Sequence, residues 1–250
     1  MTPEEIQRVK DLLPTTLGSE EIRGTIAADI LRRSVWSARM ASVPYLAQIR
    51  DVCARVLAGE INQATAVKEL MDTLTSMGHS PLDPGGLTNP ASLRRLNLIV
   101  DTQTQMAASV ARIDNQTEAT LMLWPAWELV RFEDRAKPRQ DWAARWRAAG
   151  EYCGWQGALQ NRFIALKNSP IWAALGQGAG GFRDTLGNPY PPFAYSSGLD
   201  WMEVTAEECA RLGLSTASAT APESASLSPG MKDIRDAIER YGFPQIGVDL

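Results

Sequence analysis

Residues 165–204, with the sequence ALKNSPIWAALGQGAGGFRDTLGNPYPPFAYSSGLDWMEV, decide how the second half of this chain folds. The stretch holds too many proline, glycine and aromatic residues for one regular helix, and too many apolar residues for a disordered linker. Pro189, Pro191 and Pro192 fix their own φ angles and restrict the residues before them. We therefore expect a rigid segment whose backbone is largely set before packing occurs.

The aromatic side chains of this segment suit one of two roles. Large rings with a polar edge either seal a small core or face a partner protein. Both roles remain open from the sequence. The candidate protein-interaction residues of the segment are Tyr190, Phe193 and Tyr195.

Residues 127–132 (WELVRF) have the β-branched and aromatic character of a strand. With residues 163–166 and 199–204 as two further candidate strands, they predict a small sheet. Most of the remaining apolar residues recur at helical spacing. The predicted fold class is therefore α+β and predominantly α-helical, with N-terminal helices, a long central helix, the small sheet with its Pro/aromatic-rich segment, a flexible linker and a C-terminal helix.

Capping residues and breaks divide the first third of the chain into four predicted helices. Their expected ranges are 2–13, 19–38, 44–59 and 62–78. A Pro/Gly run follows, and the longest predicted helix then extends from residue 89 to about residue 119.

Four regions follow from these breaks. We expect an N-terminal helical region over 1–84, an α+β domain over 85–214, a disordered Ser/Thr/Ala/Pro linker over 215–229, and an amphipathic helix with a tail over 230–250. The apolar stripe of the last helix is predicted to dock on its own domain or on a partner. Its candidate interaction residues are Met231, Ile234, Ile238 and Tyr241.

Composition narrows the class of protein. The 250 residues are 44% hydrophobic with a net charge of −4, which is typical of a globular chain. The sequence lacks an apolar run of about 18 residues and begins with acidic residues, so we expect a soluble protein made in the cytoplasm with no membrane partner. Its three cysteines lie far apart, which favours reduced thiols over a disulfide framework or a zinc site.

One region is basic although the whole chain is acidic. Residues 131–167 carry eight basic residues against four acidic ones, and they are rich in tryptophan. Such a region could contact nucleic-acid phosphates, and the alternative is a solvated face of arginine stems over buried indoles. The candidate DNA-binding residues are Arg139, Arg145, Arg147 and Arg162.

Motifs for catalysis, cofactors or metals are not found. The glycine-rich run 176–181 follows a predicted helix instead of a strand and lacks the Gly-Lys-Ser/Thr of a phosphate loop. His79 is the single histidine, and no nucleophile motif accompanies it. We therefore predict no catalytic residue, no cofactor and no metal, and a binding or structural protein instead of an enzyme.

The order of features from the long helix onward resembles the phage head morphogenesis family, the minor head proteins of the Mu F-like kind. The resemblance is carried by RRLNLIVDTQTQMAASVAR (94–112), WPAWELVRFED (124–134), DWAARW (141–146), ALKNSPIW (165–172), LGNPYPPFAYSSGLDWMEV (186–204) and EECARLGL (207–214). It implies a minor capsid protein present in few copies inside the virion head near the portal, acting in head assembly and in genome packaging or ejection. The implied partners are the portal protein, double-stranded DNA and the major capsid or scaffold protein.

Two alternatives come from other functional classes. The first is an enzyme carried in the virion that acts on nucleic acid or cell wall, using Glu133, Asp134 and Asp141 beside the arginine group. It requires at least two of these carboxylates to converge in a cleft. The second is a helical adaptor or scaffold protein whose N-terminal helices bind a partner.

Overall fold

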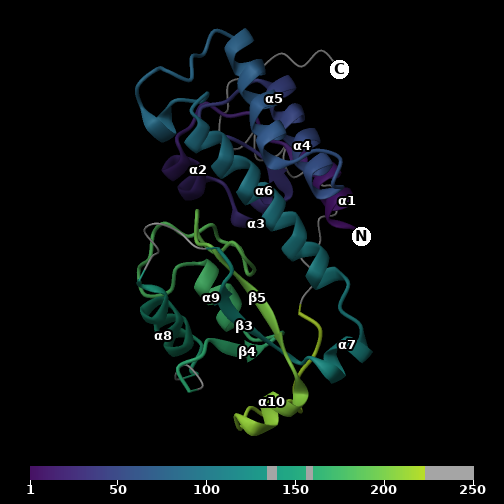
Figure 1. The fold of residues 1–250 in the computed structure, drawn as a ribbon. Helices are drawn as coiled ribbons and strands as arrows, with labels where there is room; N and C mark the ends of the chain where they lie inside the picture. Colours follow the sequence, from purple (N-terminus) through teal and green to yellow (C-terminus); the bar gives the residue numbers. More distant parts are fainter. Residues whose placement is uncertain (134–139, 156–159, 223–250) are drawn as a thin grey trace. The chain divides into compact units, whose positions relative to one another are not determined.

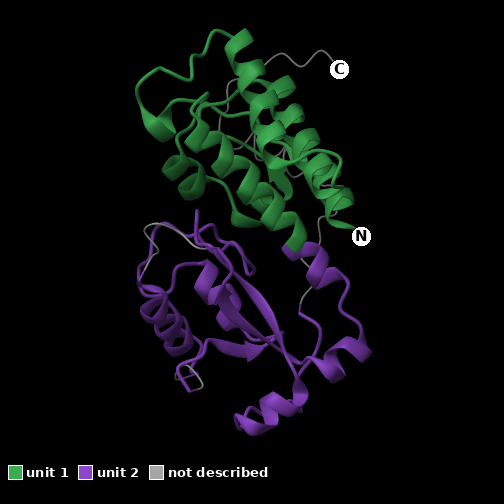
Figure 2. Ribbon diagram, in the orientation of Figure 1, with its two compact units in different colours: residues 1–108, 226–250 green, residues 109–225 purple. Residues whose placement is uncertain are grey.

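The structure is a computed structural model that describes residues 1–133, 140–155 and 160–222. Its fold class is α+β, as the sequence predicts: about 48% of the chain is helical, and the described residues form ten α-helices, a three-stranded sheet and a two-stranded sheet (Figure 1). By their contacts the described residues divide into two compact units, residues 1–108 and residues 109–222 (Figure 2).

Unit 1 is a set of helices joined by short connections. Two predicted caps are present: Thr2 Oγ1 accepts a hydrogen bond from the Glu5 amide, and Asn62 Oδ1 accepts one from the Thr65 amide. A cap that was not predicted is Ser42, whose Oγ accepts from the Tyr45 amide. The elements are α1 (Pro3–Arg8), β1 (Asp11–Leu12), α2 (Ser19–Thr25), α3 (Ala28–Arg33), β2 (Ser34–Val35), α4 (Val43–Leu57), α5 (Gln63–Ser76), the 3₁₀ helix η1 (Gly86–Thr88) and the first part of α6 (Leu93–Asp114).

The first two helices are shorter than the sequence predicts. α1 ends at Arg8 instead of Leu13, and the predicted helix over 19–38 is divided into α2 and α3. The reason is a pairing that helical periodicity does not reveal: β1 and β2 form a parallel ladder, and the Leu13 amide donates to the Val35 carbonyl at 3.0 Å. A long-range ladder here replaces helical hydrogen bonds.

The core of unit 1 lies between α4, α5 and the beginning of α6. Ile49 and Val52 of α4 and Leu70 of α5 are fully buried, and Leu96 and Val100 of α6 belong to the same apolar cluster. Because α6 completes this core, the Pro/Gly run that the sequence uses as a boundary at residue 84 lies inside unit 1, and the division by contacts falls within α6.

Unit 2 is built around an antiparallel sheet of order β4-β3-β5. Trp127 pairs with Ala165 on one side and with Glu203 on the other. The predicted long helix ends at Asp114 because Thr117 caps a separate helix. The elements are α7 (Glu118–Leu123), β3 (Ala126–Arg131), α8 (Trp142–Tyr152), β4 (Ile164–Leu166), α9 (Ile171–Gly176), β5 (Leu199–Val204) and α10 (Ala206–Arg211).

The two faces of this sheet bury different side chains. On one face the rings of Trp127 and Trp201 stack with centroids 3.7 Å apart, and Trp172 of α9 meets both at 6.3 and 5.4 Å. On the other face Ala126, Ile164 and Val204 pack with Cys209 of α10. Strand alternation separates the aromatic layer from the aliphatic one.

The segment 165–204 is packed as the proline spacing suggests. Phe193 lies 6.1 Å from Trp172 and 6.2 Å from Trp201, measured between ring centroids. The backbone at Gly176, the last residue of α9, lies against the backbone at Asn188. A Cβ added at Gly176 would lie 1.7 Å from the Asn188 carbonyl oxygen. The glycine run therefore serves the close approach of two backbone segments.

The first part of the predicted linker, residues 215–222, belongs to unit 2. Asn168 Nδ2 donates to the Ser218 carbonyl at 2.8 Å and to Thr220 Oγ1 at 2.9 Å. Residues 223–229 of the predicted linker and the predicted helix and tail over 230–250 lie outside the described residues.

Candidate functional site

Arg145 of α8 is a buried structural cation in this fold. Its side chain is 5% exposed and bonds Asp141 at 2.8 Å and Asp184 at 2.9 Å. The guanidinium also lies 4.3 Å from the centroid of Phe182 and 5.1 Å from that of Trp142. Arg145 therefore joins α8 to the loop after α9 and does not present its charge to solvent.

The four candidate DNA-binding arginines do not form one exposed face. Arg162 forms a bidentate ion pair with Glu128 of β3 and a further pair with Glu208 of α10. Arg147 is exposed, and Arg139 lies outside the described residues. Arg145 is buried instead of exposed, and Arg162, whose side chain is 35% exposed, is ion-paired with carboxylates distant in sequence.

The aromatic candidates of the Pro-rich segment take the core role. Tyr190 and Phe193 are fully buried, and Tyr195 is half-buried. The side chains that seal unit 2 are therefore not displayed for a partner. The remaining interaction candidates lie outside the described residues: Met231, Ile234, Ile238 and Tyr241.

The carboxylates of the enzyme hypothesis are not brought together within the described residues. Glu133 is exposed, Asp141 is bound to Arg145, and Asp134 lies outside the described part of the chain. This arrangement gives that alternative no structural support.

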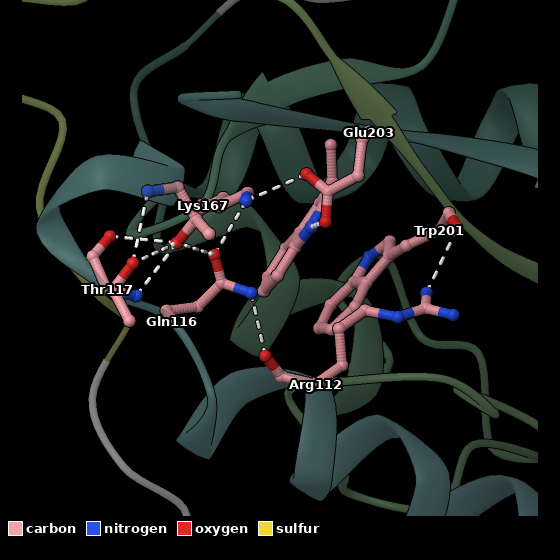
Figure 3. A network of polar contacts seen from close by, with 8 residues as sticks. Arg112, Gln116, Thr117, Lys167, Trp201 and Glu203 are labelled. Carbon is pink, nitrogen blue, oxygen red and sulfur yellow. Dashed lines mark hydrogen bonds and ion pairs between the residues drawn. The ribbon is translucent and has the colours of Figure 1, made fainter. Parts of the chain in front are cut away.

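A polar network around Lys167 is the most developed cluster of functional groups in unit 2, and Figure 3 shows the Lys167 ammonium directed toward Gln116 and Glu203. Lys167 Nζ lies 2.7 Å from Gln116 Oε1 and 2.7 Å from Glu203 Oε2. Trp127 Nε1 donates to the other Glu203 oxygen at 3.0 Å, and its ring centroid lies 5.3 Å from the ammonium. An amide, a carboxylate and an indole therefore surround a single amine.

The Lys167 side chain is only 1% exposed, whereas that of Glu203 is 39% exposed. Burial lowers the pKa of Lys167 below its ordinary value, and the hydrogen bond and charge of Glu203 act in the opposite direction. The Lys167 amine is thus shielded from water, whereas the Glu203 carboxylate is accessible to water.

The end of α6 is fixed to the sheet beside this amine. Arg112 Nη1 donates to Asp200 Oδ1 at 3.1 Å and to the Trp201 carbonyl at 3.0 Å. Gln116 Nε2 donates back to the Arg112 carbonyl at 2.7 Å (Figure 3). The Gln116 amide is therefore held in one orientation.

The sequence motifs give no indication of this network. Lys167 and Gln116 are 51 positions apart, and although Lys167 lies in ALKNSPIW, no motif links it to Gln116. The one available signal is the position of Lys167 directly after a predicted strand, in a segment otherwise too apolar for a lysine.

The most exposed apolar element of unit 2 is α7. None of its residues is buried, and Met122 and Leu123 are 72% and 57% exposed. Trp124, directly after the helix, is 37% exposed. Three successive exposed apolar side chains make this the segment of unit 2 that we single out as a candidate contact with another protein.

Unit 1 contains a pocket of about 510 Å³, lined in part by Glu21, Arg39, Thr88 and Arg95. Arg95 donates to Ser37 Oγ at 2.8 Å and to the Leu87 carbonyl at 3.3 Å. Arg39 is exposed and has a φ of 57°. The Arg95 guanidinium is therefore occupied by protein acceptors.

Within the described ranges, no cluster of three metal-ligating side chains occurs, and none of the helices has the length and apolarity to cross a bilayer. Comparison with protein-family models, with curated proteins and with solved structures gave no match.

Proposed function

We propose that this protein is a minor head protein of a phage or prophage, held in few copies near the portal inside the head. It acts in head assembly and in genome packaging or ejection by binding the portal protein, with DNA as a further ligand. The proposal rests on the resemblance carried by residues 165–172 and 186–204.

The place of these residues in the fold supports the proposal. ALKNSPIW supplies most of β4 and the start of α9, and the later motif supplies β5 and the fully buried Phe193. The shared stretch is therefore the framework of unit 2 and not a scattered surface pattern.

Binding to the portal protein is better supported than binding to DNA. Arg145 and Arg162 are engaged by carboxylates, so their charges are largely neutralised before DNA could reach them. The exposed apolar residues of α7 offer a surface suited to a protein partner. We expect the portal to cover Met122, Leu123 and Trp124.

Co-sedimentation of the full chain with the portal protein of the same phage, with and without DNA and at low and moderate salt, tests this function. Salt-resistant binding to the portal is expected, because apolar contact is weakly screened. Binding to DNA alone that weakens steeply with salt would show that the resemblance is misleading and that phosphate contact dominates.

A variant with Met122→Ser and Leu123→Ser should lower portal affinity about tenfold or more, since apolar anchors dominate such contacts. The matched control is Tyr152→Ser, which removes an apolar side chain that is 75% exposed at the end of α8. Equal loss in both variants would contradict a contact through α7.

A further inference from the structure

We propose that Lys167 and Gln116 become joined by an intramolecular isopeptide bond, with Glu203 as the group that moves the protons. The amine, the amide and the carboxylate of the network described above are the three groups that such a condensation requires.

The reacting atoms are close. Lys167 Nζ lies 2.7 Å from Gln116 Oε1. Because a carbonyl bond is about 1.2 Å long, the Gln116 carbonyl carbon lies at most about 4 Å from the amine. Reacting atoms in a near-attack geometry are about 3–3.5 Å apart. A small rotation of the Gln116 amide would bring its carbonyl carbon within this distance of Lys167 Nζ.

The amine is poised as a nucleophile. Its side chain is 1% exposed, which disfavours the charged ammonium and lowers the pKa of Lys167. Glu203 Oε2, 2.7 Å from Nζ, is within reach to accept the proton. The second Glu203 oxygen is held by Trp127 Nε1, which fixes the carboxylate in place.

The amide is oriented for attack. Gln116 Nε2 donates to the Arg112 carbonyl at 2.7 Å, which turns its oxygen toward the amine. The Thr120 hydroxyl lies 3.5 Å from that oxygen, and it could donate to the negative charge that develops there only by leaving its 2.8 Å contact with the Thr117 carbonyl.

The step balances without an oxidant or a co-reactant. Glu203 accepts one proton from the Lys167 ammonium, and the freed lone pair forms the bond from Nζ to the Gln116 carbonyl carbon. As the bond from that carbon to Nε2 breaks, Glu203 gives this proton to Nε2 and accepts the second proton from Nζ. Ammonia leaves, and Glu203, which is 39% exposed on its side chain, returns the second proton to water.

Unit 1 supplies a matched pair that lacks the carboxylate. Lys10 Nζ lies 2.9 Å from Gln103 Oε1, both side chains are buried, and burial lowers the pKa of Lys10 to about 8. Among the ion pairs of the described residues none involves Lys10. The ionisable group that acts on Lys10 is the thiol of Cys53, not a carboxylate, and burial raises the pKa of that thiol to about 12, so it stays protonated near neutral pH. We therefore expect that Lys10 and Gln103 do not form a bond.

The intact mass of the purified full chain, measured after the folded protein has reached a constant mass, tests the bond. The wild type is expected to be lighter than its sequence by one ammonia. Digestion with trypsin should yield a branched peptide that joins residues 113–131 to residues 163–183, with no cleavage after Lys167.

Variants then assign the roles. Lys167→Met, Gln116→Ala and Glu203→Gln should keep the full sequence mass, whereas Lys10→Met should lose one ammonia like the wild type. Near-ultraviolet circular dichroism of the stacked Trp127 and Trp201 checks that each variant is folded. Where Glu203→Gln fails to fold, Glu203→Asp is used, and it should slow the loss of ammonia.

Four results would overturn the proposal. A wild-type chain at its full mass excludes the bond. Loss of one water in place of ammonia assigns the bond to Glu203 instead of Gln116. Loss of two ammonia molecules, with residue 10 joined to residue 103, shows that no carboxylate is needed. Unchanged loss in a folded Glu203→Gln variant removes Glu203 from the chemistry.

Discussion

Two lysines that sequence reasoning leaves unremarked are the most unusual residues of this protein. Lys10 and Lys167 are both about 2% exposed, although lysine is seldom fully buried. Lys167 has a carboxylate beside it, whereas Lys10 has the Gln103 amide as its hydrogen-bond acceptor and the Cys53 thiol as a further neighbour. The difference in partners gives the two residues different consequences for stability.

Replacing Lys10 by methionine should stabilise the fold by about 1–3 kcal/mol at pH 7, since a buried charge is replaced by an apolar chain of similar length. The matched control is Lys68→Met on α5, where the lysine side chain is 69% exposed and the change should be within about 0.5 kcal/mol. Urea unfolding monitored by circular dichroism measures both. A stability loss in Lys10→Met would show that the Gln103 hydrogen bond outweighs the buried charge.

The same residue predicts a pH dependence. The folded pKa of Lys10 is about 8, below the ordinary value of about 10.4 for an unfolded chain. Below pH 8 the lysine is charged in both states and its destabilising effect is fully present. Between pH 8 and about 10.4 the unfolded state binds more protons, so the free energy of unfolding should rise, by up to about 3 kcal/mol. The difference between wild type and Lys10→Met should shrink over this range, as urea titrations at each pH will test.

Both interpretations of the basic region, as a contact for nucleic-acid phosphates or as a solvated face of arginine stems, place Arg145 at the surface. Its burial in the fold can be tested by mutation. Arg145→Ala should lower the free energy of unfolding by about 2–3 kcal/mol, because it removes the ion pairs with Asp141 and Asp184 and the packing on Phe182. Arg147→Ala, two positions away and exposed, should change it by less than about 0.5 kcal/mol. Equal small effects would restore the view of Arg145 as a surface residue.

At the level of elements, the strands of unit 2 depend on the return of the chain between α9 and β5. Gly176→Ala places a methyl group 1.7 Å from the Asn188 carbonyl oxygen, and backbone must move to admit it. We expect a loss of about 3 kcal/mol or more, or failure to fold. Gly24→Ala in α2, where a Cβ meets nothing within 4 Å, should instead stabilise by about 0.5–1 kcal/mol. Thermal melts of the two variants give the comparison.

At the level of the whole molecule, each unit has its own core. Calorimetry should therefore resolve two unfolding transitions, with Lys10→Met raising the midpoint of one and Arg145→Ala lowering that of the other. The shared helix α6 is the element through which the transitions could couple. A single transition that responds to both variants would show that α6 unites the units into one cooperative fold.

The sequence by itself determined what depends on neighbours along the chain. Caps such as Thr2 and Asn62 mark helix starts because a side chain reaches an amide three residues away. The strand over 199–204 follows from β-branched and aromatic content. The α+β class can therefore be predicted from helix caps and from the residue content of the strands.

Only the tertiary structure decided what depends on partners far apart in sequence. The parallel pairing of β1 with β2, the carboxylates that neutralise Arg145 and Arg162, and the amide that meets Lys167 all join positions that no periodicity links. The sequence does not show whether a charged side chain faces water or a buried partner. Its burial and its partners, which determine its pKa and its reactivity, are set by the tertiary contacts.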